Sequence, residues 1–231
     1  MTLPQHYDQT YRTVGILCTL SLFVLGLAGN ILVIFVVSRN VAMQTSTNCY
    51  LVSLAVADVL LLISAALPTL VEYFLIVDEF IFGSVGCSLM VFSQYLGVNV
   101  SALCITAFTV ERFVAICHPL QLHLFGSMKR AIVIILSIWI SCAVYSGPWL
   151  KLATTQPVTF SDGSSIDKCT FSLPRGAYLV YYICDIVLFY VTPLCVTTFL
   201  YTLMAHRLSA SVKTFNSQTS YNYRYRKQVC R

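Results

Sequence analysis

The chain has 231 residues, of which 58% are hydrophobic and 10% charged, and its formal net charge is +5. Soluble globular domains are about half apolar and about a quarter charged, so 14 Lys and Arg with 9 Asp and Glu are too few to make a soluble surface of this size. The composition excludes an ordinary soluble enzyme, a disordered chain and a dedicated nucleic-acid-binding module. It indicates an integral membrane protein made of helices.

Five long apolar runs follow one another along the chain, with polar segments between them. Each run has the roughly 20 residues that a helix needs to cross the hydrocarbon core of a bilayer. The backbone must satisfy its own hydrogen bonds in lipid, and the alternating pattern of a membrane barrel is missing, so we expect helices. The predicted spans are 14–37, 49–71, 85–117, 131–150 and 177–205.

These spans divide the chain into three parts. Residues 1–13 are expected to be a short extracellular N-terminus, residues 14–205 the transmembrane bundle, and residues 206–231 a cytosolic segment. We interpret the first run as a permanent span because its apolar stretch is too long for a signal peptide and no cleavage site follows it.

The basic residues predict the orientation. Arg39 follows the first span, and Lys129 and Arg130 lie between the third and fourth spans. The loop after the second span has no Lys or Arg and carries the acidic residues Glu72, Asp78 and Glu79. Because basic loops stay in the cytosol, the N-terminus is predicted to lie outside. The basic segment after the fifth span is then expected to contact lipid rather than nucleic acid.

Asp58 in the second span needs an explanation, because a carboxylate at that depth costs roughly 2.5–3.5 kcal/mol on insertion. One interpretation is a cation or proton site inside the bundle, for which Asn30 and Ser101 are candidate partners. The alternative is a protonated carboxyl group with a purely structural hydrogen bond. Asp185 in the fifth span is interpreted as shallower, and for it we expect interfacial packing.

A polar stripe runs along the third span. Helical spacing places Gln94, Tyr95 and Asn99 on one face. Amide and phenol groups there are suited to a water-accessible cavity that recognises amide-rich ligands. The alternative is hydrogen bonding between helices, worth about 0.6 kcal/mol on average in membranes. The residues alone do not decide between these interpretations.

Glu111 and Arg112 lie at the predicted cytosolic end of the third span. An adjacent acid and base at this position are suited to a lock that holds Arg112 inward until another helix releases it. The alternative is that both side chains only extend to the membrane surface.

The positions of the ten cysteines predict one disulfide. Cys87 and Cys169 lie on the predicted outer side, whereas the others lie within spans or face the reducing cytosol. Their bond would hold the loop between spans four and five over the mouth of the bundle. No Cys or His cluster has the spacing of a metal site.

Taken together, the chain resembles the rhodopsin-like (class A) G-protein-coupled receptors over essentially its whole length. The matching residues are Gly29-Asn30, Leu54 to Asp58, Cys87, Glu111-Arg112-Phe113, Cys117 to Leu120, Trp139, Cys169, Pro193 and Tyr201. Residues 46–58, 94–99 and 105–112 narrow the resemblance to the thyrotropin-releasing hormone receptor group. The implied fold is an all-α, polytopic membrane bundle containing the first five helices of a seven-helix receptor.

The resemblance implies a peptide ligand. Tyr95 and Asn99 would contact a tripeptide-amide hormone, with Gln94 nearby. Amine receptors carry an Asp where Gln94 stands, so an amine ligand is disfavoured. No cofactor is implied apart from a sodium ion at Asp58, with Asn30 and Ser101 completing that allosteric site.

The resemblance also implies a coupling switch. Arg112 would turn toward a heterotrimeric G protein on activation, and Leu120 would pack into that protein. Glu111, Pro119 and Tyr201 belong to the same switch. The implied protein is not an enzyme but a plasma-membrane receptor that signals through Gq, phospholipase C and calcium. Its expected partners are the peptide hormone, the G protein, the bilayer and a second receptor copy.

Helices six and seven of such a receptor are missing from the sequence, and 226–229 resembles the cytosolic start of helix six. We therefore expect a truncated receptor. One alternative is a non-signalling isoform that associates with full receptors. Another is a small transporter with Asp58 as its ion site, which the lack of repeats and broken helices disfavours.

Overall fold

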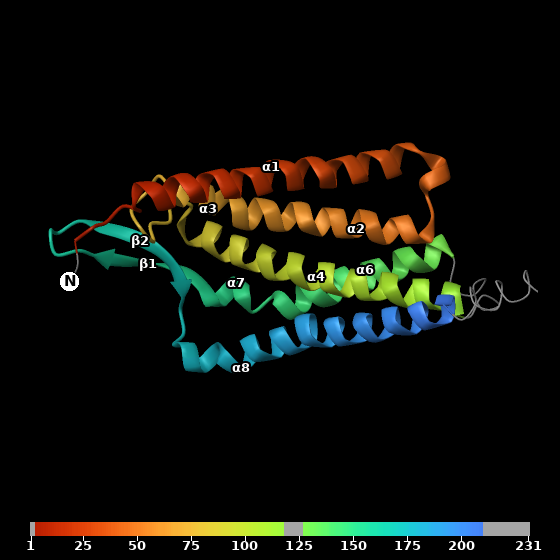
Figure 1. Ribbon diagram of the computed structural model, residues 1–231. Helices are drawn as coiled ribbons and strands as arrows, with labels where there is room; N and C mark the ends of the chain where they lie inside the picture. Colours follow the sequence, from red (N-terminus) through yellow and green to blue (C-terminus); the bar gives the residue numbers. More distant parts are fainter. Residues whose placement is uncertain (1–2, 118–126, 210–231) are drawn as a thin grey trace, which may run out of the picture.

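The computed structural model describes residues 3–117 and 127–209. In this part of the chain, five helices are long and apolar enough to cross a membrane (Figure 1). They span Gln9–Arg39, Ser46–Glu72, Gly83–Cys117, Met128–Leu152 and Arg175–Ser209. Every predicted span lies inside one of these helices, so the prediction of an all-α membrane bundle is confirmed.

The first two spans are joined by a short connection. The side chain of Asp8 accepts the N–H of Thr10 at the start of α1, and Thr45 caps the start of α2 in the same way. The elements are α1 (Gln9–Arg39), the 3₁₀ turn η1 (Val41–Met43) and α2 (Ser46–Leu61). Hydroxyl and carboxylate side chains at these positions satisfy backbone N–H groups that the first helical turn leaves unpaired.

Two of the long helices contain a π-helical turn. The second span continues from α2 through η2 (Leu62–Ala66) into α3 (Leu67–Glu72). The fifth span consists of α8 (Arg175–Ile186), η4 (Val187–Val191) and a helix that continues to Ser209. Pro68 and Pro193 lie just after these turns. Proline has no N–H and crowds the preceding turn, and a π-turn accommodates both effects without ending the helix.

The third span, α4 (Gly83–Cys117), forms the centre of the bundle. It packs against α2 on one side and against α6 (Met128–Ser146) on another. Gly97 allows the close approach to α2, because a Cβ atom there would lie 3.1 Å from the carbonyl oxygen of Ala57. The core residues at this contact are Ala57, Leu96, Val100, Cys104 and Cys142.

A β-hairpin follows the fourth span, and the sequence analysis did not predict it. After the short helix α7 (Trp149–Leu152), strand β1 (Ala153–Thr159) pairs antiparallel with β2 (Ser165–Phe171). Gly163 adopts a positive φ of 85° in the connecting turn, a conformation that glycine tolerates best. Hydrogen bonds from Ser164 lower the pKa of Asp162 in this turn. An Asp-Gly pair is a known hairpin signal.

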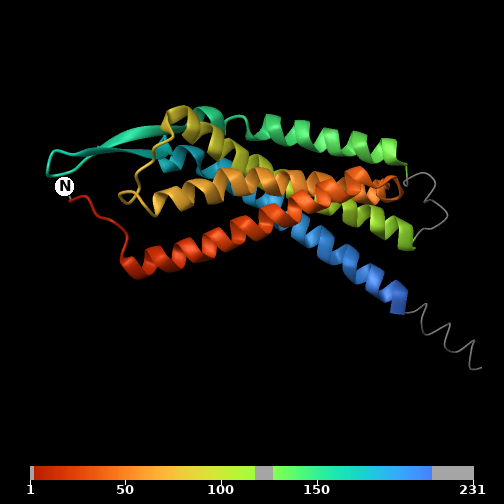
Figure 2. The same ribbon diagram turned by 90° about the horizontal axis from the view of Figure 1, so that it is seen from above.

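The hairpin and the N-terminal residues together cover one end of the bundle, which we call the hairpin end (Figures 1 and 2). The hydroxyl of Tyr7 donates to Glu72 at 2.5 Å, and burial together with Glu72 raises the pKa of Tyr7. The loop between α3 and α4 contacts the hairpin, since the N–H of Phe80 donates to the carbonyl of Asp167 at 2.7 Å. Segments distant in the sequence are thus held over the same end of the helices.

Candidate ligand-binding site

A cavity of about 520 Å³ lies between α4 and the fifth span, in the half of the bundle nearer the hairpin end. The three residues of the predicted polar stripe all line it. The lining residues are Leu61, Gln94, Tyr95, Val98, Asn99, Tyr182, Asp185, Ile186, Phe189 and Tyr190. The wall therefore combines apolar and aromatic surface with a few polar groups, as ligand pockets usually do.

Tyr95 is fixed by an aromatic stack. Its ring lies parallel to that of Trp149, with centroids 4.1 Å apart and an interplanar angle of 10°. Trp149 is fully buried and also contacts the rings of Phe171, Tyr178 and Tyr181. This aromatic cluster joins α4, α7, β2 and α8, and it orients the Tyr95 ring beside the cavity. The sequence analysis did not single out Trp149, because nothing in its local sequence distinguishes it from a membrane-interface tryptophan.

Gln94 is engaged by the second span. Its Nε2 atom donates to the carbonyl oxygen of Ser64 at 2.7 Å. Ser64 lies in the π-turn η2, and π-turns leave helix carbonyls available to outside donors. Gln94 therefore links the cavity wall to the irregular turn of the neighbouring helix.

Asp185 lies in the cavity and not at the membrane interface, so the expectation of interfacial packing for this residue was wrong. Its side chain is 8% exposed, and its Oδ1 atom accepts a hydrogen bond of 3.0 Å from Nδ2 of Asn99, which is completely buried. The misjudged depth has a physical cause. The fifth helix begins at Arg175, so Asp185 lies almost three turns inside it and faces α4.

Several buried polar atoms on α4, α6 and α7 have no hydrogen-bond partner among the residues that the structure describes. They are Asn99 Oδ1, Tyr145 Oη, Ser146 Oγ and Trp149 Nε1. A buried polar atom without a partner costs about 1–3 kcal/mol. Of these four residues only Asn99 lines the cavity, so its Oδ1 atom is the one placed to accept a hydrogen bond from a group in the cavity.

The predicted disulfide is present. Cys87 at the start of α4 is bonded to Cys169 in β2, and their Cα atoms are 5.6 Å apart. The bond fixes the hairpin to the top of α4, so the mouth of the cavity is bounded by a cross-linked segment.

The residues of the predicted sodium site are only partly brought together. Ser101 Oγ donates to Asp58 Oδ1 at 3.1 Å, which links α4 to α2. The amide nitrogen of Asn30 instead donates to the carbonyl of Gly26 in its own helix at 2.9 Å. Carboxylate and hydroxyl oxygens are ligands that hard cations prefer, so Asp58 and Ser101 fit a sodium ion, and the structure gives Asn30 a different hydrogen bond.

At the end opposite the hairpin, Glu111 and Arg112 are held by α2. Ser46 Oγ donates to Glu111 Oε1 at 2.5 Å, and Arg112 donates to Thr47 Oγ1. The Arg112 guanidinium is also 3.5 Å from the Glu111 carboxylate. The sequence analysis did not foresee the two hydroxyl partners. Tyr201 is half-exposed on the fifth span, and Pro119 and Leu120 lie outside the described residues.

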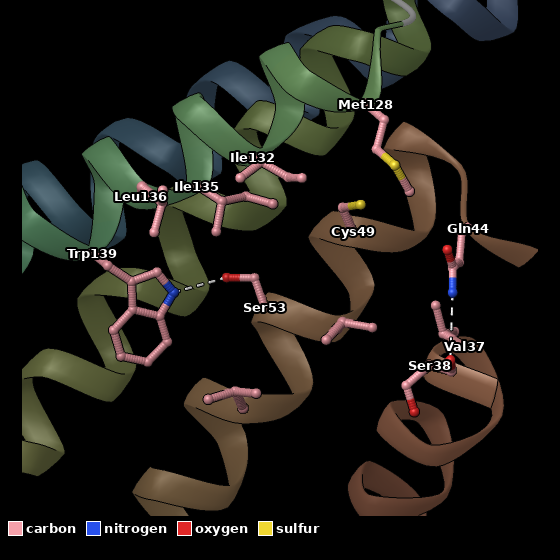
Figure 3. Close-up of a pocket in the computed structure, with 12 residues that line it drawn as sticks. Val37, Ser38, Gln44, Cys49, Ser53, Met128, Ile132, Ile135, Leu136 and Trp139 are labelled. Carbon is pink, nitrogen blue, oxygen red and sulfur yellow. Dashed lines mark hydrogen bonds between the residues drawn. The ribbon is translucent and has the colours of Figure 1, made fainter. Parts of the chain in front are cut away.

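A second cavity, of about 600 Å³, opens on the side of the bundle between α1, α2 and α6 (Figure 3). Its wall is almost entirely apolar, with Ile132, Ile135 and Leu136 on α6 facing Cys49 on α2. The indole N–H of Trp139 donates to Ser53 Oγ at 3.0 Å at one edge. Because this cavity has no charged lining residue, we prefer the polar cavity beside α4 as the candidate site for a peptide.

Comparison with known proteins gives the same class of molecule. The family described as 7 transmembrane receptor (rhodopsin family) matches residues 29–231. The thyrotropin-releasing hormone receptors of Gallus gallus and Homo sapiens are each 40% identical over 198 residues, which is 86% of this chain and 49% of theirs. Neuromedin-U receptor 2 of Mus musculus is 34% identical over 190 residues, or 81% of this chain and 48% of that receptor.

The chain spans about half the length of the curated relatives it matches. These relatives are receptors and not enzymes, and the five apolar helices agree with a multi-pass membrane protein. The match covers most of the chain, from the last third of the first helix through the other four helices of the bundle. The chain therefore belongs to the rhodopsin family of seven-transmembrane receptors.

Proposed function

We propose that the protein contributes the hormone-binding and signalling helices of a receptor for a small amidated peptide of the thyrotropin-releasing hormone type. The observation that carries this proposal is the cavity beside α4, where Gln94, Tyr95 and Asp185 combine with an aromatic wall. The 40% identity to thyrotropin-releasing hormone receptors supports the same ligand class. A peptide amide offers both N–H donors and carbonyl acceptors, which suits a wall of amide, phenol and carboxylate groups.

The proposed orientation places the hairpin end outside the cell. Glu72, Asp78 and Glu79 lie at this end, while Arg39 and Arg130 lie at the opposite end. Basic segments favour the cytosolic side. The Cys87–Cys169 disulfide lies at the same end as the acidic residues, and disulfides persist in the oxidising exterior. The cavity is then reached from the extracellular side.

Signalling is proposed to leave the molecule at the opposite end. Arg112 is tied to α2 through Thr47 and to its neighbour Glu111, while its side chain is 37% exposed. Release of these contacts would free the guanidinium to turn toward a G protein, in line with two-state switches built from ion pairs. We propose coupling to Gq-type proteins, phospholipase C and calcium, with Pro119, Leu120 and Tyr201 contributing to the same surface.

The Asp58–Ser101 pair is proposed as the protein's part of a sodium-linked allosteric site. The two oxygen-bearing side chains come from α2 and α4, the helices with the most extensive mutual packing in the bundle. A sodium ion bound there would neutralise the carboxylate and strengthen the contact between these helices.

The test is a calcium measurement in cells that express the receptor from its full-length transcript. Thyrotropin-releasing hormone and related amidated peptides should raise cytosolic calcium, and the same peptides with a free carboxylate should be much weaker. A second cell line expresses the variant T47A, which lacks the hydroxyl group that accepts a hydrogen bond from Arg112. A correctly localised receptor that responds to none of the amidated peptides would contradict the proposed ligand class.

A further inference from the structure

We propose that residues 5–7 form a strap that closes the hairpin end of the bundle, and that a ligand arriving from outside enters after this strap opens. The strap pairs with residues 75–77 of the loop between α3 and α4. This inference rests on the orientation and the ligand class proposed above, and two of its three tests need no hormone.

Backbone pairing holds the strap to the loop. His6 and Ile76 form an antiparallel bridge, and the N–H of Val77 donates to the carbonyl oxygen of Gln5 at 3.0 Å. The His6 ring adds a contact, because its Nδ1 atom donates to the carbonyl oxygen of Leu75 at 3.1 Å. The backbone bond flanks the bridge, so His6 and Ile76 form a non-hydrogen-bonded pair, in which opposite side chains lie closest. This pair is therefore a suitable position for an engineered cross-link.

Tyr7 anchors the strap to the ends of two helices. Its hydroxyl donates at 2.5 Å to Oε1 of Glu72, the last residue of α3. Its ring stacks on Tyr11 of α1, with centroids 5.2 Å apart, and meets Tyr73 edge-on at 6.0 Å. Gly15 leaves room for this cluster, since a Cβ atom there would lie 2.5 Å from the Tyr73 ring. The strap thus has a defined docking position on α1 and α3.

The loop between α3 and α4 connects the strap to the hairpin. The N–H of Phe80 donates to the carbonyl oxygen of Asp167 in β2 at 2.7 Å. Next to this bond, Lys168 Nζ lies 2.6 Å from Asp78 Oδ2. The N-terminal segment runs beside the hairpin in both views of the molecule (Figures 1 and 2). The strap, the loop and β2 therefore form one continuous lid.

The strap is suited to opening because none of its residues is buried. Gln5 and His6 are exposed, and Tyr7 is partly exposed. An isolated pairing of two short segments has little stability of its own, and segments that bury little apolar surface open at the lowest free-energy cost. The hairpin is also held to α4 by the Cys87–Cys169 bond. Opening the strap would therefore free the loop while the base of β2 stays attached.

The first experiment asks whether the strap docks on the loop. In the receptor expressed from its full-length transcript, the double variant H6C/I76C should form a disulfide under mild oxidation, and reductant should restore the reaction of both thiols with an alkylating reagent. The control pair is H6C/I81C, because Ile81 is 57% exposed in the same loop and lies outside the bridge. Cross-linking that is as fast in the control pair, or absent in H6C/I76C, would overturn the docking.

The second experiment measures opening of the lid without hormone. Tyr7→Phe removes the hydroxyl that donates to Glu72, so the amides of Val77 and Phe80 should exchange hydrogen about threefold faster or more. Tyr11→Phe is the matched control, since it makes the same change in the neighbouring ring and leaves the bond to Glu72 in place. Equal acceleration in the two variants, or none in Tyr7→Phe, would contradict the strap.

The third experiment uses radiolabelled thyrotropin-releasing hormone as the probe. The cross-linked H6C/I76C receptor should bind and release the hormone about tenfold more slowly than its reduced form, with a similar Kd, because entry and exit share one path. Unchanged rates, or a weaker Kd with an unchanged association rate, would show that the strap does not control access. If the unchanged receptor binds no hormone, the proposed function fails, and the cross-linking and exchange results still decide whether the strap closes this end.

Discussion

Tyr95 has two separable features, a ring that stacks on Trp149 and a hydroxyl group beside the cavity. Aromatic pairs of this kind are worth about 0.5–1.5 kcal/mol beyond the area that they bury. The stack therefore fixes the position of the ring whether or not a ligand is present, and the hydroxyl group has no hydrogen-bond partner among the described residues.

Substitutions at Tyr95 should distinguish these features. Tyr95→Phe keeps the stack, so we expect unchanged thermal stability and a hormone affinity about tenfold lower, because the proposed hydrogen bond from the hydroxyl group to the hormone is lost. Tyr95→Ala should lower both affinity and stability. Hormone affinity and melting temperature of the solubilised receptor are measured for both variants. An equal fall in melting temperature in the two variants would show that the hydroxyl group has a structural role.

Asp58 and Ser101 make a second prediction at the scale of single residues. Asp58→Asn should abolish the dependence of hormone affinity on sodium concentration, and Ser101→Ala should reduce it. Asn30→Ala should have the smallest effect, since the Asn30 amide donates to Gly26 of its own helix. Titrations with sodium, with potassium as the matched control, measure the effect. A sodium response that survives in Asp58→Asn would contradict the proposed ion site.

At the scale of elements, the hairpin depends on its cross-link to α4. A disulfide that closes a loop with a sequence separation of 82 residues limits the freedom of the unfolded chain and is typically worth about 2–4 kcal/mol. The same bond fixes β2, whose Phe171 contacts Trp149 above the cavity.

Removing this cross-link should therefore affect both stability and binding. Cys169→Ser is expected to lower the melting temperature and the hormone affinity, and Cys87→Ser should do the same. The double variant should lose no more than either single one, because both remove one bond. Cys18→Ser is the control, as Cys18 is free and exposed on α1. Normal binding in Cys169→Ser would show that the hairpin is held by its other contacts.

At the end of the bundle opposite the hairpin, the start of α2 holds the last turns of α4. Ser46 donates to Glu111, and Thr47 accepts from Arg112. Thr47→Ala should raise calcium signalling in the absence of hormone, because the Arg112 guanidinium loses a hydrogen-bond partner. Thr45→Ala is the comparison, since Thr45 caps the same helix without contacting Arg112. Basal calcium in receptor-matched cells measures the difference, and equal rises in both variants would point to a general loosening of the helix.

Over the whole molecule, the sequence predicts most of the helical architecture because membrane insertion imposes one strong rule. A span must be long and apolar, and each predicted span lies within an observed helix. The disulfide was also predictable, since compartment and position leave one outer pair of cysteines.

The remaining features depend on tertiary contacts that no local pattern encodes. The depth of Asp185 follows from where its helix begins, and its partner Asn99 lies 86 residues earlier in the chain. The π-turn that receives Gln94 and the stacking of Tyr95 on Trp149 likewise require two packed elements. Asp162-Gly163 is a turn signal from which the hairpin could have been predicted. This signal is only two residues long, and the long apolar spans dominate the sequence pattern.

The most direct test asks whether the peptide occupies the cavity between α4 and the fifth span. A photoreactive phenylalanine analogue is placed at position 182, which lines the cavity, or at position 180, which is 70% exposed but is not among the lining residues. Labelled thyrotropin-releasing hormone should cross-link at position 182 and should not cross-link at position 180. An excess of unlabelled hormone should abolish the cross-link at position 182. Equal cross-linking at both positions, or none at 182 in a receptor that binds hormone, would contradict the assignment of this cavity as the hormone site.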